Sequence, residues 1–426
     1  MIQTYRILTI ILYPLLFLFL YYRRLINKED PKRFKEKILV SKFNVKRKEK
    51  SKLFWFHASS IGEFKSILPI IYELNSRDKD VQFLITTTTF SSGNLAKKEL
   101  KRFINVEHRF LPFDVIFLID KFLRLWKPDK IFLVDSEIWP NLILKARDYN
   151  IPIAILNARL TNRSFDRWKI FPKTARKIFG VFDLCLCCNN QTKKYLKKLK
   201  AKNVYFKGNI KLINQIKIRK YLDINGKFLL MKKFWFAASI HQGEDIFCLK
   251  THLKLKKKFK NIITIIAPRH IERSKEIKSL SESLNLSTQI LNQNDHISKN
   301  KEIIIINYFG ALNNYFKYAK SIFMGKSIIK ELKNNSGQNP IEAAKLNCKI
   351  YHGPYVYNFE EIYKIFKNRK ISKKIKNFEE LSNNLISDLR KTKKKRNIDN
   401  SIDILGKETL KSTMVLIKKF LYDKIY

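Results

Sequence analysis

The chain has 426 residues, of which 45% are hydrophobic, and its formal net charge is +49 from 86 Lys and Arg against 37 Asp and Glu. This length fits two or three domains, and the hydrophobic share excludes an intrinsically disordered protein. The positive charge predicts an anionic partner: nucleic acid, an acidic membrane face or a phosphorylated substrate.

The first predicted element is an uncharged apolar stretch, ILTIILYPLLFLFLYY, over residues 7–22, with arginines on both sides. A membrane-spanning helix needs about 17–25 apolar residues, so this stretch is borderline, and Pro14 is expected to kink it. A cleaved signal peptide would need small residues at its cleavage site, and a core helix would show a polar face. We predict a membrane anchor over residues 1–26, with the following basic sequence on the cytoplasmic side.

Strand and helix patterns then alternate through a first predicted domain, residues 27–212. Predicted strands cover 52–59, 81–89, 130–137, 151–159, 181–188 and 204–210, and predicted helices cover 62–74, 138–150 and 191–201. Short apolar runs separated by helical patterns indicate a parallel sheet covered on both faces.

A charged connector near residues 213–225 opens a second predicted domain, 213–426, whose last helices could pack back on the first domain. Its predicted strands cover 233–239, 261–270, 287–293, 302–308 and 318–325, and its predicted helices run through 248–253, 341–346 and 358–366. The fold class expected is therefore α/β, with two doubly wound, Rossmann-like domains. A basic run at 391–396 fits a solvated surface or contact with anionic lipid.

Two stretches of similar sequence lie near the start of these two predicted domains. FWFHASSIGEF begins at Phe54, and FWFAASIHQGE begins at Phe234, an offset of 180 positions (234 minus 54). Chance similarity of short apolar words is one explanation. The other is that each domain begins with a strand that turns into a helix at the edge where such sheets bind ligands.

Carboxylates follow several of these strands. Ser60 and Glu63 form a capping-box pattern, S-x-x-E, which by itself explains them as a helix start. Glu63 also lies at the ligand-binding edge, beside Gly62, where a carboxylate could take a proton from an attacking hydroxyl. Glu137, two residues after Asp135, fits either acid–base chemistry or an ordinary helix start, and Lys211 by itself says little in so basic a chain.

In the second domain, Pro268 and Arg269 end a predicted strand, and Arg suits phosphate recognition. Residues 336–344, SGQNPIEAA, read as a loop leading into a helix whose first amides could hold a phosphate, while Glu342 could bind ribose hydroxyls. Together these features suggest a nucleotide. The five cysteines show no paired spacing, so neither a metal site nor a disulfide is expected.

At this point the sequence resembles a known family, the 3-deoxy-D-manno-octulosonic acid (Kdo) transferases of lipopolysaccharide synthesis, which have the GT-B glycosyltransferase fold. The matching words, in the family's order between His57 and Phe359, are HASSIGE, DSEIWPN, LNARLTNRS, KGNIK, APRHIER, SGQNPIEAA and HGPYVYNF. The resemblance implies two domains facing a cleft. It also implies transfer of Kdo, with inversion, from CMP-Kdo to a lipid A precursor such as lipid IVA, on the cytoplasmic face of the inner membrane.

The resemblance also implies roles for individual residues. Glu63 would be the general base, and Glu137 and Lys211 would stabilise the transition state. The residues implied in CMP binding are Pro268, Arg269, Phe309, Gly310, Ala311, Asn339, Pro340, Ile341 and Glu342. No metal and no cofactor is expected, and anionic membrane lipid is expected as a partner.

The sequence departs from the family pattern at several positions. Asp135 replaces the first glutamate of the E-x-E word, and Ser336 replaces a glycine. Asn307 and Ala311 stand where the family has acids, which puts nucleotide binding in doubt if those carboxylates make the contacts. One alternative is a GT-B membrane glycosyltransferase using another nucleotide sugar. The other is a basic, membrane-tethered nucleic-acid-binding protein, although the sequence has no RNA-recognition word or zinc finger, and we expect no nucleic-acid partner.

Overall fold

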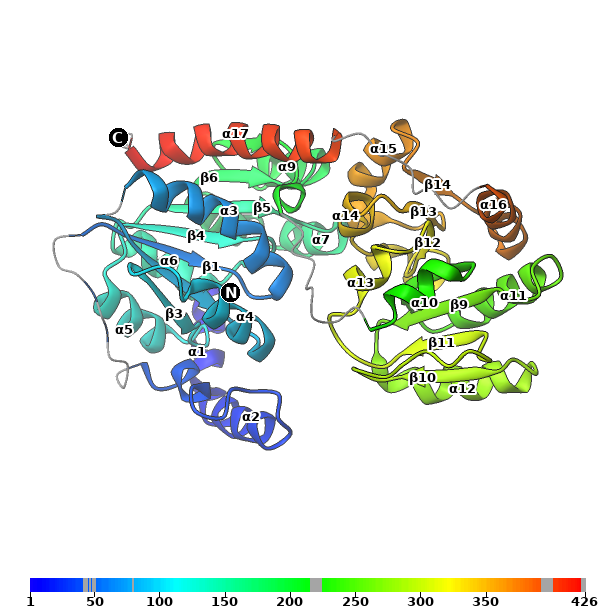
Figure 1. Ribbon diagram of the computed structural model, residues 1–426. Helices are drawn as coiled ribbons and strands as arrows, with labels where there is room; N and C mark the ends of the chain where they lie inside the picture. The colour runs from blue at the N-terminus through cyan, green and yellow to red at the C-terminus, as the bar shows by residue number, and fades with distance from the viewer. Residues whose placement is uncertain are drawn as a thin grey trace. The chain divides into compact units, whose positions relative to one another are not determined.

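The computed structural model describes residues 1–40, 45, 47, 51–78, 80–214, 224–391 and 401–422. It has two compact units: unit 1 comprises Met1–Asn214 and Asp403–Tyr426, and unit 2 comprises Gln215–Ile402. Each unit is a parallel sheet flanked by helices (Figure 1). The basic run predicted at 391–396 lies, apart from Lys391, outside the described residues.

Unit 1 is built on a seven-stranded sheet with the order β3-β2-β1-β4-β5-β6-β7. The strands are β1 (Leu53–His57), β2 (Gln82–Thr87), β3 (Val106–Phe110), β4 (Lys130–Val134), β5 (Ile153–Ala158), β6 (Phe182–Cys187) and β7 (Val204–Phe206), and all pair in parallel. The strand order reverses between β1 and β4. The carboxyl ends of these two strands therefore form the switch point at which doubly wound sheets bind ligands.

Helices cover both faces of this sheet. They are α3 (Ile61–Arg77), α4 (Phe90–Leu100), α5 (Ile116–Trp126), α6 (Pro140–Asp148), α7 (Asn162–Ile170), α8 (Pro172–Phe179), α9 (Asn190–Lys198) and α17 (Ser401–Tyr422), with the short 3-10 turns η1 (Phe34–Lys37) and η3 (Ile210–Ile213). On one face Trp55 of β1 packs against Phe122 of α5, and on the other Phe132 of β4 packs against Phe420 of α17. Helix α17 thus completes the core of unit 1, although it comes last in the chain (Figure 1).

The apolar N-terminal stretch forms two helices, α1 (Ile2–Ile11) and α2 (Tyr13–Leu25), where the sequence predicted one kinked segment. Pro14 occupies the first turn of α2, next to the bend of 56° between the helices. Among the described residues no single helix is long and apolar enough to cross a membrane, whereas this bent pair meets both criteria when its helices are taken together.

One side of this helix pair packs on the rest of unit 1. The ring of Tyr13 lies 5.0 Å from that of Phe117, and the ring of Tyr21 lies 5.0 Å from that of Phe34. Other apolar side chains of the pair are exposed: Ile7, Leu8, Ile10, Ile11, Leu12, Leu15, Leu18, Phe19, Tyr22 and Leu25. The segment is therefore attached to the domain by one face and presents an apolar surface with the other.

Unit 2 has a second seven-stranded parallel sheet, in the order β10-β11-β9-β8-β12-β13-β14. Its strands are β8 (Phe234–Ile240), β9 (Ile263–Pro268), β10 (Thr288–Leu291), β11 (Ile303–Ile306), β12 (Ser321–Met324), β13 (Lys349–His352) and β14 (Ser372–Lys374). Its helices are α10 (Gly226–Met231), α11 (Glu244–Lys256), α12 (Ser274–Ser283), α13 (Leu312–Phe316), α14 (Ile341–Lys345), α15 (Glu360–Asn368) and α16 (Phe378–Arg390), with the 3-10 turns η5 (Ile271–Arg273), η6 (Lys330–Asn335) and η7 (Tyr357–Phe359).

The predicted α/β class with two doubly wound sheets is confirmed. The two similar stretches supply β1 and β8, which lie at the switch point of their sheets. The strand predicted over 204–210 is wrong in its second half, because Gly208 has a φ of 102° and the chain turns into η3. Strands β3, β13 and β14 were not predicted: β3 carries three charged or polar residues, and β14 reads Ser-Lys-Lys.

Candidate active site

Glu63 lies at the start of α3, directly after the carboxyl end of β1. Its backbone N–H donates to Ser60 Oγ at 3.4 Å, and its carboxylate accepts the N–H of Ser59 at 2.8 Å and the hydroxyl of Ser60 at 2.8 Å. Ser60 therefore caps the helix as the sequence predicted, whereas the Glu63 carboxylate bonds the N–H of Ser59, one residue before the N-cap, and the hydroxyl of Ser60. A carbon added at Gly62 would meet no atom within 4 Å, so the approach to this helix start is open.

The surroundings of Glu63 change its acidity. Burial raises its pKa, the carboxylates of Asp135 and Glu137 raise it further, and the hydrogen bonds from Ser60 and Ser59 only partly offset this. A carboxylate with a raised pKa is a stronger base when it is ionised. Capping and proton abstraction are therefore compatible roles for the same side chain.

Glu137 follows β4, the neighbour of β1 in the sheet. Its Oε2 lies 3.1 Å from Nε2 of His57 and 2.6 Å from Nε1 of Trp139. The His57 side chain is fully buried, whereas the Glu137 side chain is 13% exposed. Both of these hydrogen bonds hold the Glu137 carboxylate through the same oxygen, Oε2.

Asp135 and Lys211 form an ion pair at the same sheet edge. Lys211 Nζ lies 2.7 Å from Asp135 Oδ2, and Asp135 adopts a left-handed backbone with a φ of 66°. Burial alone would raise the pKa of Asp135 and lower that of Lys211. Their mutual attraction and hydrogen bond outweigh it, so the pKa of Asp135 lies below its usual range and that of Lys211 above. Both groups are therefore charged at neutral pH.

The start of α6, beside Glu137, is already occupied by a side chain of the protein. Asp114 accepts the N–H groups of Asn141 and Leu142, each at 2.9 Å, and the hydroxyl of Tyr5 at 2.9 Å. Since Asp114 takes these amides, this helix start is not an anion site for a substrate. Asp114 also links Tyr5 of α1 to the first turn of α6, which begins three residues after Glu137.

In unit 2, residues predicted to bind a nucleotide follow the carboxyl ends of β9 and β11. Pro268 is buried as the last residue of β9, and Arg269 is exposed directly after it. Beyond β11, Phe309 is 72% exposed, Gly310 has a φ of 83° with open space on its Cβ side, and Ala311 is buried. These strands are neighbours in a parallel sheet, so both groups lie at one edge.

The loop after β12 brings further predicted residues to this edge. The N–H of Gly337 donates to the carbonyl of Lys326 at 2.6 Å, and a Cβ at Gly337 would lie 2.9 Å from Val356 Cα. Asn339 Oδ1 accepts the N–H of Ile341 at 3.0 Å. The sequence suggested that the first amides of this helix could hold a phosphate. The N–H of Ile341 is already bonded to Asn339 and is not free for that role.

The remaining predicted residues of this loop differ in burial. Pro340 and Ile341 are buried and Glu342 is half-buried on α14. Of these four predicted residues, Asn339, which is exposed, and Glu342 have side chains that a ligand can reach.

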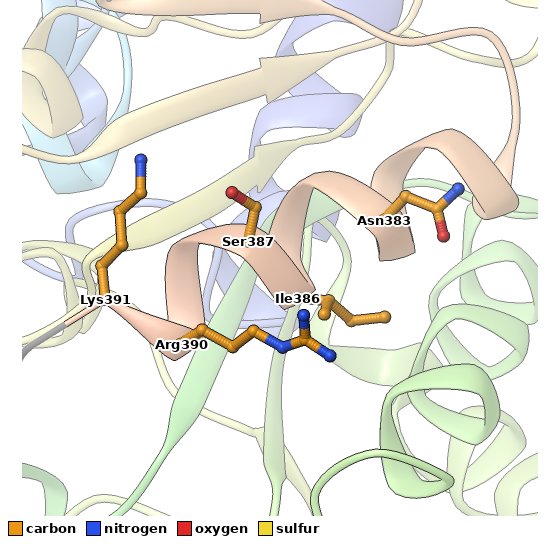
Figure 2. A pocket seen from close by; sticks show the side chains of 5 residues that line it. All are labelled: Asn383, Ile386, Ser387, Arg390 and Lys391. Atoms are coloured by element: carbon orange, nitrogen blue, oxygen red, sulfur yellow. The ribbon is translucent and has the colours of Figure 1, made fainter.

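A shallow hollow of about 380 Å³ lies elsewhere in unit 2, on helix α16 (Figure 2). It is lined by Asn383, Ile386, Ser387, Arg390 and Lys391. None of the residues predicted for catalysis or nucleotide binding belongs to it. Among the described residues no group of three or more His, Cys, Asp or Glu side chains is placed to hold a metal ion.

Comparison with known proteins decides the family. Residues 32–214 match the family model described as 3-Deoxy-D-manno-octulosonic-acid transferase (kdotransferase). The chain is 30% identical over 392 residues to the 3-deoxy-D-manno-octulosonic acid transferase of Rickettsia bellii, which covers 90% of each protein. It is also 30% identical over 376 residues to a probable mitochondrial 3-deoxy-D-manno-octulosonic acid transferase of Arabidopsis thaliana, over 85% of this chain and 81% of that protein.

The chain belongs to the Kdo transferase family. It is a glycosyltransferase, as the sequence predicted. Solved structures support the GT-B fold: UDP-GlcNAc 2-epimerase from Neisseria meningitidis matches with a TM-score of 0.58 at 15% identity, over 86% of this chain and all of that chain. A glycosyltransferase from Rickettsia africae matches with a TM-score of 0.57 at 12% identity, over 88% of this chain and all of that chain.

Within this Kdo transferase, sequence reasoning missed two buried side chains near the predicted sites. His57 was quoted only as part of a motif. Glu244 begins α11, is fully buried, and accepts the N–H groups of His241, Lys326, Ser327 and Ile328 at 3.0, 2.6, 2.8 and 3.2 Å. An acid at a helix start was the available signal for Glu244, but three of its four partners, Lys326, Ser327 and Ile328, lie more than 80 positions away.

Proposed function

We propose that this Kdo transferase moves Kdo from CMP-Kdo to a hydroxyl of a lipid A precursor such as lipid IVA, with inversion at the anomeric carbon. The observation that carries the proposal is the acidic cluster at the switch point of unit 1, where Glu63 is half-buried, open on one side and raised in pKa. Family membership supports the sugar that is transferred.

The proposed reaction is a single displacement. Glu63 takes the proton of the acceptor hydroxyl, and the oxygen forms a bond to the anomeric carbon of Kdo. The bond from that carbon to the phosphate oxygen breaks, and its electron pair leaves with cytidine monophosphate. Because the sugar is already activated as a phosphate ester, we expect cytidine monophosphate to depart without the help of a metal ion.

Two further side chains of unit 1 would act on charge that develops in the transition state. Lys211 is held by Asp135 as an ammonium group, which can offset negative charge on the donor. Glu137, held through Oε2, can face the positive charge that grows on the sugar ring. These are the roles that the family resemblance implied for both residues.

We propose that the carboxyl-end edge of the unit 2 sheet holds CMP-Kdo. Arg269 offers a cation to the phosphate, Phe309 an exposed ring, and Asn339 and Glu342 polar groups. Since Ala311 is buried and the Cβ side of Gly310 is open, the backbone groups of residues 309–311 would make the contacts with the nucleotide. Backbone contacts would tolerate the absence of acids at Asn307 and Ala311.

We further propose that the enzyme works on the cytoplasmic face of the inner membrane, attached through α1 and α2. The exposed apolar side chains of this helix pair support attachment. Arg23 and Arg24 in the last turn of α2 suit contact with anionic lipid headgroups. A lipid acceptor would then lie in the bilayer to which the enzyme is attached.

The deciding experiment is a lipid-product assay with CMP-Kdo and lipid IVA, comparing the wild type with Glu63→Gln. The chain offers a matched control at α16, where Asn377 caps the N–H of Glu380 at 2.9 Å and Glu380 accepts the N–H of Lys376 at 2.9 Å. We expect Glu63→Gln to lose at least about 100-fold in kcat, as the loss of a general base does. Glu380→Gln should keep its activity.

Similar activity of the two variants would reduce Glu63 to a helix cap and overturn the proposed base. Thermal melting of both variants shows that each is folded. The donor is tested separately by competition, in which CMP should inhibit and UMP should not. Stronger inhibition by UMP would replace the cytidine donor by another nucleotide sugar.

A further inference from the structure

A series of three hydrogen bonds in the interior of unit 1 links Trp55 to Glu137. Trp55 Nε1 donates to Thr86 Oγ1 at 2.9 Å, Thr86 Oγ1 lies 2.9 Å from His57 Nδ1, and His57 Nε2 lies 3.1 Å from Glu137 Oε2. Trp55, His57 and Thr86 are fully buried. The series connects β1, β2 and the end of β4, three neighbouring parts of the sheet.

The donors and acceptors in this series of hydrogen bonds place a proton on Nε2 of His57. An ionised carboxylate only accepts hydrogen bonds, so His57 Nε2 must carry a proton toward Glu137. An indole N–H only donates, so Thr86 accepts from Trp55 and has its own hydroxyl proton to give to His57 Nδ1. With a proton on Nε2, His57 donates to Glu137, and the Thr86 hydroxyl provides a hydrogen-bond partner for Nδ1.

This arrangement leaves Glu137 in one orientation. Both His57 and Trp139 donate to Oε2, at 3.1 and 2.6 Å, and neither contacts Oε1. We propose that His57 is a positioning residue, which fixes the Glu137 carboxylate by one oxygen and presents the other to the reacting sugar. The inference rests on the proposed function, because it assumes that Glu137 acts in the transfer.

The same three residue types meet once more in unit 2, away from the proposed site. His252 Nδ1 lies 2.8 Å from Thr264 Oγ1, and His252 Nε2 lies 3.2 Å from Glu302 Oε2. Glu302 precedes β11, so this group lies at the amino ends of the strands, opposite the ligand-binding edge. His252 therefore serves as a matched control for the effect of removing a buried histidine.

The test compares two replacements that differ in which ring nitrogen they imitate. The amide of Asn reaches the place of Nδ1 only, whereas the amide of Gln reaches the place of Nε2 and can donate to Glu137. We expect His57→Asn to lower kcat by about 10- to 100-fold, by analogy with the loss seen when the groups that orient metal-binding side chains are removed. The KM for CMP-Kdo should stay within about threefold, and His57→Gln should recover most of the lost kcat.

A double-mutant cycle with Glu137→Gln isolates the coupling. In the Glu137→Gln background, His57→Asn should lower kcat by less than about threefold, because the carboxylate it orients is gone. His252→Asn, which likewise removes a fully buried histidine, should leave kcat unchanged. Equal losses from His57→Asn in both backgrounds, or an unimpaired His57→Asn enzyme, would overturn the positioning role.

Failure of the proposed function would look different. If the folded wild type transfers no Kdo to lipid IVA, both the function and the inference fail. If the wild type is active and Glu137→Gln is unimpaired, the function stands and only the inference falls.

Discussion

The acidic side chains at the end of β4 raise the pKa of Glu63 through space. Burial is the main cause of the raised pKa of Glu63, and the charges of Asp135 and Glu137 add to it. A general base must be ionised, so activity should fall as the pH drops through the raised pKa of Glu63. The acid side of the pH–rate profile should therefore lie above the usual range of a glutamate.

This coupling predicts how a neighbouring substitution changes the pH–rate profile. Glu137→Gln removes one negative charge that raises the pKa of Glu63, so the acid side of the profile should move to lower pH, even though the maximal rate falls. The measurement is kcat/KM against pH for both proteins. A shift to higher pH, or no shift, would contradict this account of Glu63.

At the scale of secondary-structure elements, the Asp135–Lys211 pair joins the end of β4 to η3. Lys211→Ala would leave the buried Asp135 carboxylate without its cation, which typically costs about 3–5 kcal/mol. Urea denaturation of unit 1 should show this loss. Arg77→Ala at the exposed pair with Glu73 is the control and should cost less than about 1 kcal/mol.

The pH dependence of this pair has a definite sign. The pKa of Asp135 is lowered on folding, so its contribution to stability is lost as the pH falls through that lowered value. The pKa of Lys211 is raised, so its contribution is lost as the pH rises through that raised value. An equal effect of Lys211→Ala at neutral pH and at a pH below the lowered pKa of Asp135 would show that the ion pair does not stabilise the fold.

At the scale of the whole molecule, the exposed face of α1 and α2 should decide membrane binding. Leu15 and Leu18 are 58% and 66% exposed, so replacing both by Glu should leave the melting temperature unchanged. Each substitution removes the favourable burial of a leucine side chain in lipid, which contributes about 1.5–3 kcal/mol. Binding to vesicles of phosphatidylethanolamine and phosphatidylglycerol should therefore weaken more than tenfold for each substitution.

A control for this prediction lies elsewhere in unit 1. Ile104 is 98% exposed and outside the helix pair, so Ile104→Glu should not change vesicle sedimentation. If Leu15→Glu/Leu18→Glu sediments with vesicles as well as the wild type does, the helix pair is not the attachment site.

Much of the fold could be predicted from local pattern, because its determinants lie close together in the chain. The apolar runs that became β1, β4, β5, β8 and β9 were visible as runs, and the helix cap that Ser60 forms with the N–H of Glu63 spans only four residues. Strand β14 could not be seen, because it has three residues and two of them are exposed lysines. Its pairing with β13, not its own composition, makes it a strand.

Short-range patterns and ordered motifs already carry the α/β class, the family and the position of Glu63 at the head of a helix. Long-range packing adds that His57 holds Glu137, 80 positions away, that Lys211 pairs with Asp135, and that α17 completes the core of unit 1. The physical reason is the strand order. Parallel pairing of β1 with β4 brings together side chains whose contact no local pattern records.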